Sequence, residues 1–251
     1  MSYVADALWL NVSPALQGFD RPLLKHIAQR TAIAQWEYAQ SPDEPTSFEI
    51  ALTLLHDYLK HCDRPIHLLG HSTGGLLALL YARQHPERVR SLTLLSVGVN
   101  PAIDWQAHYY AQRRLLPCNQ KTILRRTVYG LLGCPSKDTI ETLVTLLEQD
   151  LQHSLSPHHL FRTTNLLPVS VPVPLLVCGG IDDVVISPNQ LRDWQHYFNH
   201  AHSRLWICPG GRYFFHYFYA QEVSEQIAQF WTSIPSCPNE PVNLSLVSQA
   251  A

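Results

Sequence analysis

The chain has 251 residues, a formal net charge of −2, 46% hydrophobic residues and 15% charged residues. Its length suits one large globular domain with room for an insertion. The balanced charge and the lack of lysine or arginine runs argue against a nucleic-acid-binding class. No run of 18 apolar residues is present, so we expect no transmembrane segment.

Apolar runs of strand length alternate with helix-like stretches along most of the chain. The strand-like runs are residues 7–12, 32–36, 65–70, 89–97, 173–179 and 203–208. The helix-like stretches are residues 21–30, about 50–62, 74–85, 188–199 and 220–232. Thr46 and Glu49, just before the second helix, have the spacing of a capping box. This alternation favours an α/β fold, with a mostly parallel sheet of about six strands, helices on both faces and ligands at the carboxyl ends of the strands.

The alternation stops between residues 98 and 172, where the pattern is mainly helical. We predict a helical cap there, inserted over the strand ends. The chain then divides into a core of residues 1–97 and 173–232, the cap of residues 98–172, and a C-terminal tail of residues 233–251. The tail contains three prolines and few helical signals, and we expect a loose or surface-pinned extension.

A Gly-x-Ser-x-Gly motif, Gly70-His71-Ser72-Thr73-Gly74, lies between the third strand and the third helix. A tight turn at this place lifts the serine hydroxyl above the sheet, and glycines are needed because side chains at positions 70 and 74 would collide. The N–H of Thr73 lies at the start of a helix, where partial positive charge helps to hold an oxyanion. The motif with this context predicts that Ser72 is a nucleophile.

Three segments make the chain resemble the α/β-hydrolase family. They are the elbow and its helix, GHSTGGLLALLYARQHPERVRSLTLLS, an acid-bearing strand, PLLVCGGIDDVVISP, and the last strand with its loop, RLWICPGGRYFFHYFYAQEV. The resemblance runs from about Leu8 to Trp231. It implies a serine, an acid and a histidine in that chain order, and a cap where residues 98–172 lie. The family usually opens with two more strands, which this chain lacks.

The resemblance leaves two choices for the acid. Asp182 is the better match, three residues after Gly179 at the end of the fifth strand, and Asp183 is the rival, three residues after Gly180. A carboxylate in this loop also suits the cap of the following helix, which is the alternative role for one of the two.

The histidine position departs from the family pattern. The family usually has a histidine directly after a glycine in the loop past the last strand, and that position falls here on Tyr213, or on Arg212 with a slip of one residue. His216, three places later, is the first choice as base if a bulge at Gly210–Gly211 turns it inward; otherwise it packs at the start of the last helix. His108 on the cap is a further choice. A phenol with a pKa near 10 is a poor base, and a guanidinium cannot act as one.

The second oxyanion donor is also altered. The family often has His-Gly after its equivalent of the first strand, whereas this chain has Asn11-Val12-Ser13-Pro14. The backbone N–H of Val12 or Ser13 can still serve, since the role needs no particular side chain. The missing strands leave a sheet edge to be covered by a helix, by the tail or by a second subunit in a homo-oligomer.

The resemblance implies a serine hydrolase that cleaves a carboxylic ester or thioester through Ser72. Aromatic and leucine side chains in the cap and the last loop favour a small, apolar, acyl-bearing substrate. The alternative, supported by the missing Gly-His step, is a catalytically inactive α/β-hydrolase-like protein that binds a ligand or a partner. An acyltransferase on the same fold would share the nucleophile.

No cofactor and no metal are predicted, because the 14 histidines do not fall in metal-ligand spacings. No two of the six cysteines form a closely spaced motif. They favour a reducing compartment, and the chain start lacks the features of a signal peptide, so we expect a cytoplasmic protein.

Overall fold

The computed structural model describes residues 5–40, 43, 47–100, 103–157 and 170–235. Within them, six parallel strands form one sheet in the order β2-β1-β3-β4-β5-β6. The strands are β1 (Ala7–Asn11), β2 (Ile33–Glu37), β3 (Ile66–His71), β4 (Val89–Leu95), β5 (Leu175–Gly180) and β6 (Arg204–Cys208). The central strands are buried nearly end to end, which explains their continuous apolar runs.

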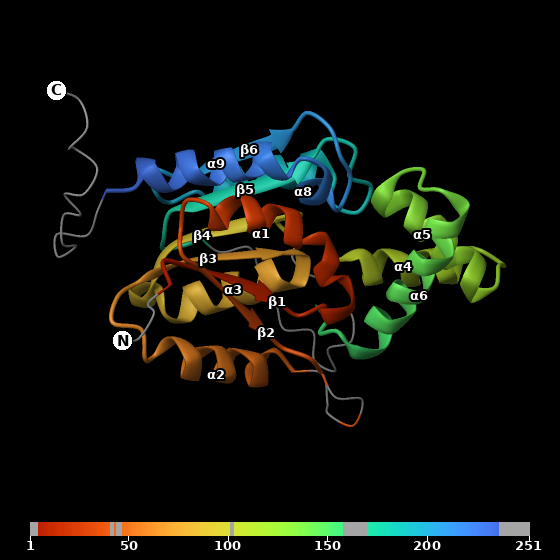
Figure 1. The fold of residues 1–251 in the computed structure, drawn as a ribbon, viewed down its shortest axis with the longest axis horizontal. Helices are drawn as coiled ribbons and strands as arrows, with labels where there is room; N and C mark the ends of the chain where they lie inside the picture. The colour runs from red at the N-terminus through yellow and green to blue at the C-terminus, as the bar shows by residue number, and fades with distance from the viewer. Residues whose placement is uncertain (1–4, 41–42, 44–46, 101–102, 158–169, 236–251) are drawn as a thin grey trace.

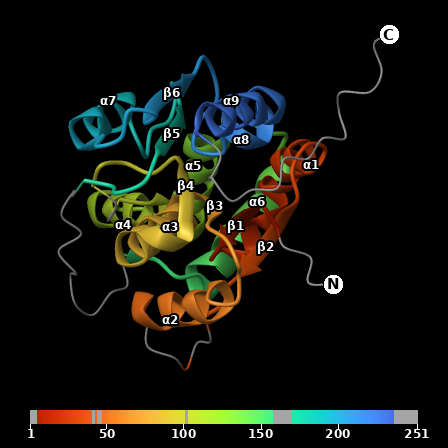
Figure 2. The ribbon, with the colours of Figure 1, turned by 90° about the vertical axis from the view of Figure 1, so that its left-hand side faces the viewer.

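Helices cover both faces of this sheet (Figures 1 and 2). The helices are α1 (Arg21–Ala28) and α9 (Ala220–Ser233) on one face, and α2 (Phe48–Leu59), α3 (Ser72–Gln84) and α7 (Pro188–Arg192) on the other. In α1 the buried side chains are Leu23, Leu24 and Ile27, a spacing of three and four residues that forms one helical stripe. Each face therefore has its own apolar core.

Three helices stand between β4 and β5 and project beyond the carboxyl ends of the strands, on the right of Figure 1. They are α4 (Trp105–Leu115), α5 (Gln120–Leu132) and α6 (Lys137–His153). Each begins at a side chain that accepts a backbone N–H of the first turn: Asp104, Asn119 and Ser136 respectively. These helices occupy the region predicted as a cap. Residues 101–102 and 158–169 of that region lie outside the described residues.

Short elements complete the structure and shape the site. They are η1 (Pro14–Phe19), η2 (Pro86–Arg88), η4 (Asp193–Tyr197) and α8 (Phe215–Phe218). The predicted helix over 188–199 is thus divided into α7 and η4. Most of the predicted tail, residues 236–251, lies outside the described residues.

The α/β prediction is confirmed, and all six predicted strands are present. The prediction of a capping box at Thr46 and Glu49, before α2, is wrong. Ser47 caps this helix, its hydroxyl accepting the N–H of Glu49 at 3.2 Å, which puts Glu49 one position too early for the reciprocal bond. Thr46 lies outside the described residues. Strand β2 forms one edge of the described sheet, and it is only partly buried.

The part of the chain that the structure describes contains no helix that is long and apolar enough to cross a membrane.

Candidate active site

The turn at Ser72 has the geometry of a nucleophile elbow. Ser72 follows the last residue of β3 and opens α3, with a φ of 51°, in the left-handed region that non-glycine residues rarely adopt. A Cβ on Gly70 would overlap the backbone of Gly74, and a Cβ on Gly74 would overlap the carbonyl oxygen of Leu10. The two glycines are therefore required by backbone contacts, as the motif predicts.

The side chain that meets the Ser72 hydroxyl is Tyr213. Its phenol O–H donates a hydrogen bond to Ser72 Oγ. Burial raises the pKa of Tyr213 well above its usual value, and the nearby Asp104 carboxylate raises it further; the contacts with Ser72 and with the backbone of Trp105 oppose this only in part. The phenol therefore keeps its proton, which it shares with Ser72 Oγ in this hydrogen bond.

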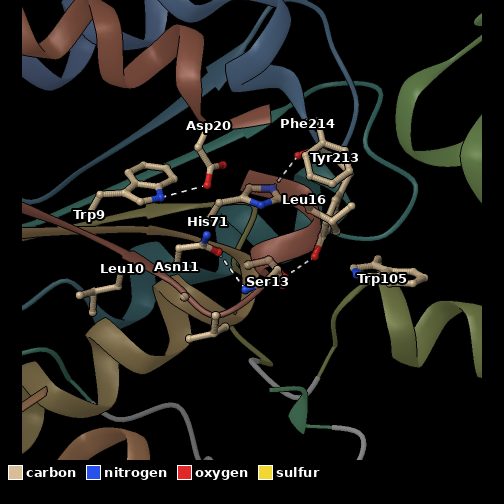
Figure 3. Close-up of a pocket in the computed structure, with 13 residues that line it drawn as sticks. Trp9, Leu10, Asn11, Ser13, Leu16, Asp20, His71, Trp105, Tyr213 and Phe214 are labelled. Atoms are coloured by element: carbon tan, nitrogen blue, oxygen red, sulfur yellow. Dashed lines mark hydrogen bonds between the residues drawn. The ribbon is translucent and has the colours of Figure 1, made fainter. Parts of the chain in front are cut away.

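The backbone of Tyr213 is fixed from two sides, of which Figure 3 shows the contact with His71. Its carbonyl oxygen lies 2.9 Å from His71 Nε2 and 3.0 Å from Ser96 Oγ. Ser96 has a φ of 48°, and its hydroxyl also reaches Asp183 Oδ2 at 3.1 Å. These contacts hold the last loop so that the phenol faces the Ser72 hydroxyl.

The structure brings Asp183 to this loop and leaves Asp182 outside it. Asp183 is buried, and its Oδ1 accepts the N–H groups of Val185 and Ile186 at 2.8 and 3.1 Å. Burial raises the pKa of Asp183 to about 6, although these hydrogen bonds oppose the rise. The side chain of Asp182 is exposed, and its backbone N–H donates to Gly211. The geometry thus favours the rival over the better sequence match.

The structure does not bring His216 to Ser72. Residues 215–218 form the short helix α8, which turns His216 towards the start of α1, where its Nε2 lies 3.0 Å from Asp20 Oδ1. His216 is fully buried, and burial lowers its pKa to about 3. The predicted bulge at Gly210–Gly211 does not turn this ring inward, so His216 packs at the end of the loop, which was the alternative role.

His71 and His216 belong to a buried polar cluster beneath the elbow. Their ring centroids are 4.4 Å apart, and the indole N–H of Trp9 donates to Asp20 Oδ2 at 3.0 Å. Burial raises the pKa of Asp20 to about 7, opposed by His71 and Trp9, and burial together with His216 lowers the pKa of His71 to about 3. Because His71 Nε2 faces a carbonyl oxygen, that nitrogen carries the proton. Both imidazoles are therefore neutral and serve as packed, hydrogen-bonded side chains.

His108, the further choice as base, and Arg212, the other residue at the position of the family histidine, are each engaged in contacts elsewhere. His108 pairs with Gln112 along α4, at 2.6 Å. Arg212 reaches across to the cap, where its guanidinium donates to the carbonyl oxygens of Tyr129 and Gly130 at 3.3 and 3.4 Å. Arg212 therefore links the last loop to α5.

A small chamber of about 20 Å³ adjoins the elbow, with room for about one water. Ser72, Asp20 and Val12 are among the residues that line it. The N–H of Ser13 is already used, since it donates to Asn11 Oδ1 at 2.8 Å (Figure 3). Of the two backbone N–H groups predicted as the second oxyanion donor, that of Val12 is therefore the better candidate.

The cap contributes a carboxylate that sequence reasoning missed. Asp104 is buried; its Oδ1 accepts the N–H of Ala107 at 2.7 Å, and its Oδ2 accepts from Ser156 at 2.6 Å and from Thr73 at 3.4 Å. It therefore joins the start of α4 to the residue after Ser72. The signal available in the sequence was an aspartate just before a helical stretch, which is typical of a helix cap. Asp20 and Ser96 gave no comparable signal.

No group of three or more histidine, cysteine, aspartate or glutamate residues in the described part of the chain is arranged to hold a metal ion.

The elbow and the six-stranded parallel sheet, with helices α4, α5 and α6 inserted between β4 and β5, define an α/β-hydrolase fold. A family model described as "alpha/beta hydrolase fold" matches residues 59–128, which include the elbow and its helix. The chain belongs to this family.

Similar proteins in other organisms span nearly the same length. The chain is 47% identical over 227 residues to an uncharacterized protein of Synechocystis sp., covering 90% of each. It is 42% identical over 231 residues to an uncharacterized protein of Nostoc sp., covering 92% of each.

Solved structures with low sequence identity have the same fold. The naproxen esterase from Bacillus subtilis has a TM-score of 0.68 at 14% identity, over 92% of this chain and 85% of that one. The enol-lactonase from Burkholderia xenovorans has a TM-score of 0.60 at 16% identity, over 90% of each chain. At this identity the likeness establishes the fold alone.

Proposed function

We propose that this chain is a non-hydrolytic member of the family, which binds an uncharged small molecule through an oxygen atom at the elbow without cleaving it. The observation that carries the proposal is the hydrogen bond from the Tyr213 phenol to Ser72 Oγ. It corresponds to the alternative function derived from the sequence, an inactive α/β-hydrolase-like binding protein.

The protonation states of the groups around Ser72 favour binding over acyl transfer. A serine attacks a carbonyl only when a base removes its proton, and the base must lie within hydrogen-bond reach. Tyr213 keeps its own proton because of its raised pKa. The two nearby imidazoles contact the Tyr213 carbonyl and Asp20, and their pKa values of about 3 make them weak proton acceptors.

The same groups suit a ligand oxygen. Because the Tyr213 phenol donates its one proton to Ser72 Oγ, the Ser72 hydroxyl can donate its own proton to a ligand oxygen, and Thr73 supplies a neutral N–H in the first turn of α3. The adjoining chamber of about 20 Å³ admits a group of water size, so the ligand presents one carbonyl or hydroxyl there and keeps its remaining atoms outside.

A second candidate is slow ester hydrolysis through Ser72. It is favoured by the elbow itself, since the strained φ of 51° and the two required glycines are costly for a residue without a chemical role. In that case Ser72 would attack the carbonyl carbon of the ester and give its proton to a water molecule in the adjoining chamber, while the N–H groups of Thr73 and Val12 hold the oxyanion. The bond to the alcohol oxygen would then break, the alcohol would leave with that proton, and a second water would release the acid from Ser72. Asp183 would act only through the Ser96 contact.

A labelling experiment separates the two candidates. Wild-type protein and a Ser72→Ala control are treated with a fluorophosphonate, and intact masses are compared alongside a serine hydrolase of known reactivity. We expect no adduct on either form and no release of nitrophenol from p-nitrophenyl butyrate. An adduct at Ser72, or ester release lost in the control, would establish hydrolysis instead.

A second measurement tests the binding half of the proposal. The neutral ketone 2-octanone is titrated in a thermal-shift assay against wild type and Tyr213→Phe, which lacks the phenol donor. We expect the Tm of the wild type to rise with ketone concentration and that of Tyr213→Phe to rise less. A ketone that shifts both forms equally, or neither, contradicts the proposed oxygen site.

We also propose that the protein is located in the cytoplasm, as the sequence predicts. The five described cysteines are all free of disulfides, and Cys178 and Cys208 are buried in the sheet as small apolar side chains. This usage agrees with a reducing compartment.

A further inference from the structure

A second and much larger hollow lies on the other side of the last loop. Its volume is about 510 Å³, within the range of pockets that enclose drug-sized molecules. One wall comes from η1 and α8, through Phe19, Tyr217 and Phe218, and the other from cap helices α5 and α6, through Leu132, Leu143 and Leu146. We call this hollow the cap cleft.

The residues that line the cap cleft indicate whether a bound molecule can be charged. None of the described residues that line it carries a charge, and its polar groups are the hydroxyls of Thr139 and Tyr217 and the thiol of Cys134. An ion would lose its hydration here without a compensating partner. The cleft therefore suits an uncharged, mostly apolar molecule.

The rim of the cap cleft exposes aromatic surface to water. Phe218 is 55% exposed and Tyr217 is 40% exposed, although both are on a short helix whose other residues, Phe215 and His216, are buried. Exposed apolar side chains grouped beside a concave surface are typical of binding sites. A bound molecule would cover them.

A stacked aromatic pair separates the cap cleft from the Ser72 chamber. The rings of Phe19 and Phe214 have centroids 4.3 Å apart, and Tyr217 meets Phe19 edge-on at 5.4 Å. Phe19 lines the cleft, whereas Phe214, which is buried, lines the chamber. The two spaces are thus adjacent, and this wall keeps their contents apart.

We infer that the cap cleft is a second binding site, which takes an uncharged, mostly apolar small molecule independently of Ser72. The ligand packs between the aromatic side chains of η1 and α8 and the leucines of the cap, and its single polar group faces Thr139. Binding involves no covalent step. The inference stands whether the elbow binds or hydrolyses its own ligand.

Thr139 offers a variant that changes the cleft without weakening the fold. It is exposed at the third position of α6, and its backbone N–H donates to the N-cap residue Ser136. In Thr139→Glu the pair becomes Ser-x-x-Glu, the spacing of a capping box, which favours the helix. Because Thr139 lines the cleft, the same change brings a negative charge to its wall. Thr142→Glu, exposed on the same helix outside the lining, is the matched control.

The experiment is a fluorescence titration with Nile red, a neutral apolar dye. We expect saturable binding to wild type, unchanged binding to Thr142→Glu and to Ser72→Ala, and at least tenfold weaker binding to Thr139→Glu. Phe218→Ser, which removes the exposed ring, also weakens binding. Non-saturable binding to wild type, or equal affinities for the two glutamate variants, would overturn the inference. Loss of binding in Ser72→Ala would place the dye in the elbow chamber and overturn its independence.

Discussion

The elbow around Ser72 and the loop from Pro209 to Phe214 are joined by one hydrogen bond. The elbow matches the pattern of a serine hydrolase, whereas the loop departs from it. The elbow has the strained φ and the two glycines that fit no side chain. The loop has a tyrosine at the position of the base, fixed by His71 and Ser96 through its carbonyl oxygen.

The difference arises because backbone contacts constrain the elbow, whereas the backbone contacts of the loop do not require a particular side chain at position 213. The elbow is maintained by backbone contacts inside the sheet and its helix, and altering it affects folding. The side chain at position 213 only projects towards Ser72, so a phenol can replace an imidazole while the loop keeps its backbone contacts. Under the proposed function, this chain combines a complete elbow with an unreactive serine.

The largest effect is expected from Gly70→Ala, which tests whether the elbow is a folding requirement. The added Cβ would overlap backbone atoms of Gly74 that cannot move freely, so we expect a loss of at least about 3 kcal/mol in the free energy of unfolding. Urea unfolding measures it. Gly98→Ala is the control, since its Cβ would lie 3.5 Å from Ile186, an ordinary contact. Equal unfolding midpoints for the two variants would contradict the argument.

Tyr213→His tests whether supplying a base at position 213 is enough to make Ser72 reactive. General-base catalysis contributes about 10²–10⁴-fold, so we expect fluorophosphonate labelling of Ser72 to become detectable in Tyr213→His, although an imidazole is shorter than a phenol and the gain should stay at the lower end of that range. Tyr213→Phe controls for removal of the phenol without supply of a base. If the two variants label at the same rate, the loop backbone as well as the side chain has left the reactive arrangement.

Asp183→Asn tests the buried carboxylate through pH. The pKa of Asp183 is raised to about 6 from a usual 3.8, so the folded state binds this proton more tightly than the unfolded state. Its contribution to stability is fully present below pH 3.8 and is lost as the pH rises through 6. Between pH 4.5 and 8 we expect the variant to gain roughly 2 kcal/mol relative to wild type. A pH-independent difference in urea unfolding would show that the carboxyl is not shifted in this way.

The smallest effect is expected from Asp182→Ala. The side chain is exposed, so the free energy of unfolding should change by less than about 0.5 kcal/mol. Asp183→Ala, in contrast, leaves the N–H groups of Val185 and Ile186 without their acceptor, at a cost of about 1–3 kcal/mol. Urea unfolding of both variants compares them, and a reversed order would restore Asp182 as the structural acid.

Local patterns predicted the scaffold well. The six apolar runs became the six strands, and the glycine spacing around Ser72 became the elbow. The mainly helical stretch after β4 contains the cap helices. In each case the information lies within a few neighbouring residues, where side-chain periodicity and backbone sterics act directly. The first choices for the acid and the base, Asp182 and His216, depended on spacing in loops and did not reach the site.

The sequence by itself determined the parallel sheet, the strained turn at Ser72 and the position at which a base was missing. Only the tertiary structure decided what replaced it. Tyr213 and Ser72 are 141 residues apart, and His216 meets Asp20 across 196 residues. Such pairs form only when the sheet and α8 set their directions. The pKa shifts that keep Tyr213 protonated and both imidazoles neutral arise from burial, a property of the packed molecule that no local pattern encodes.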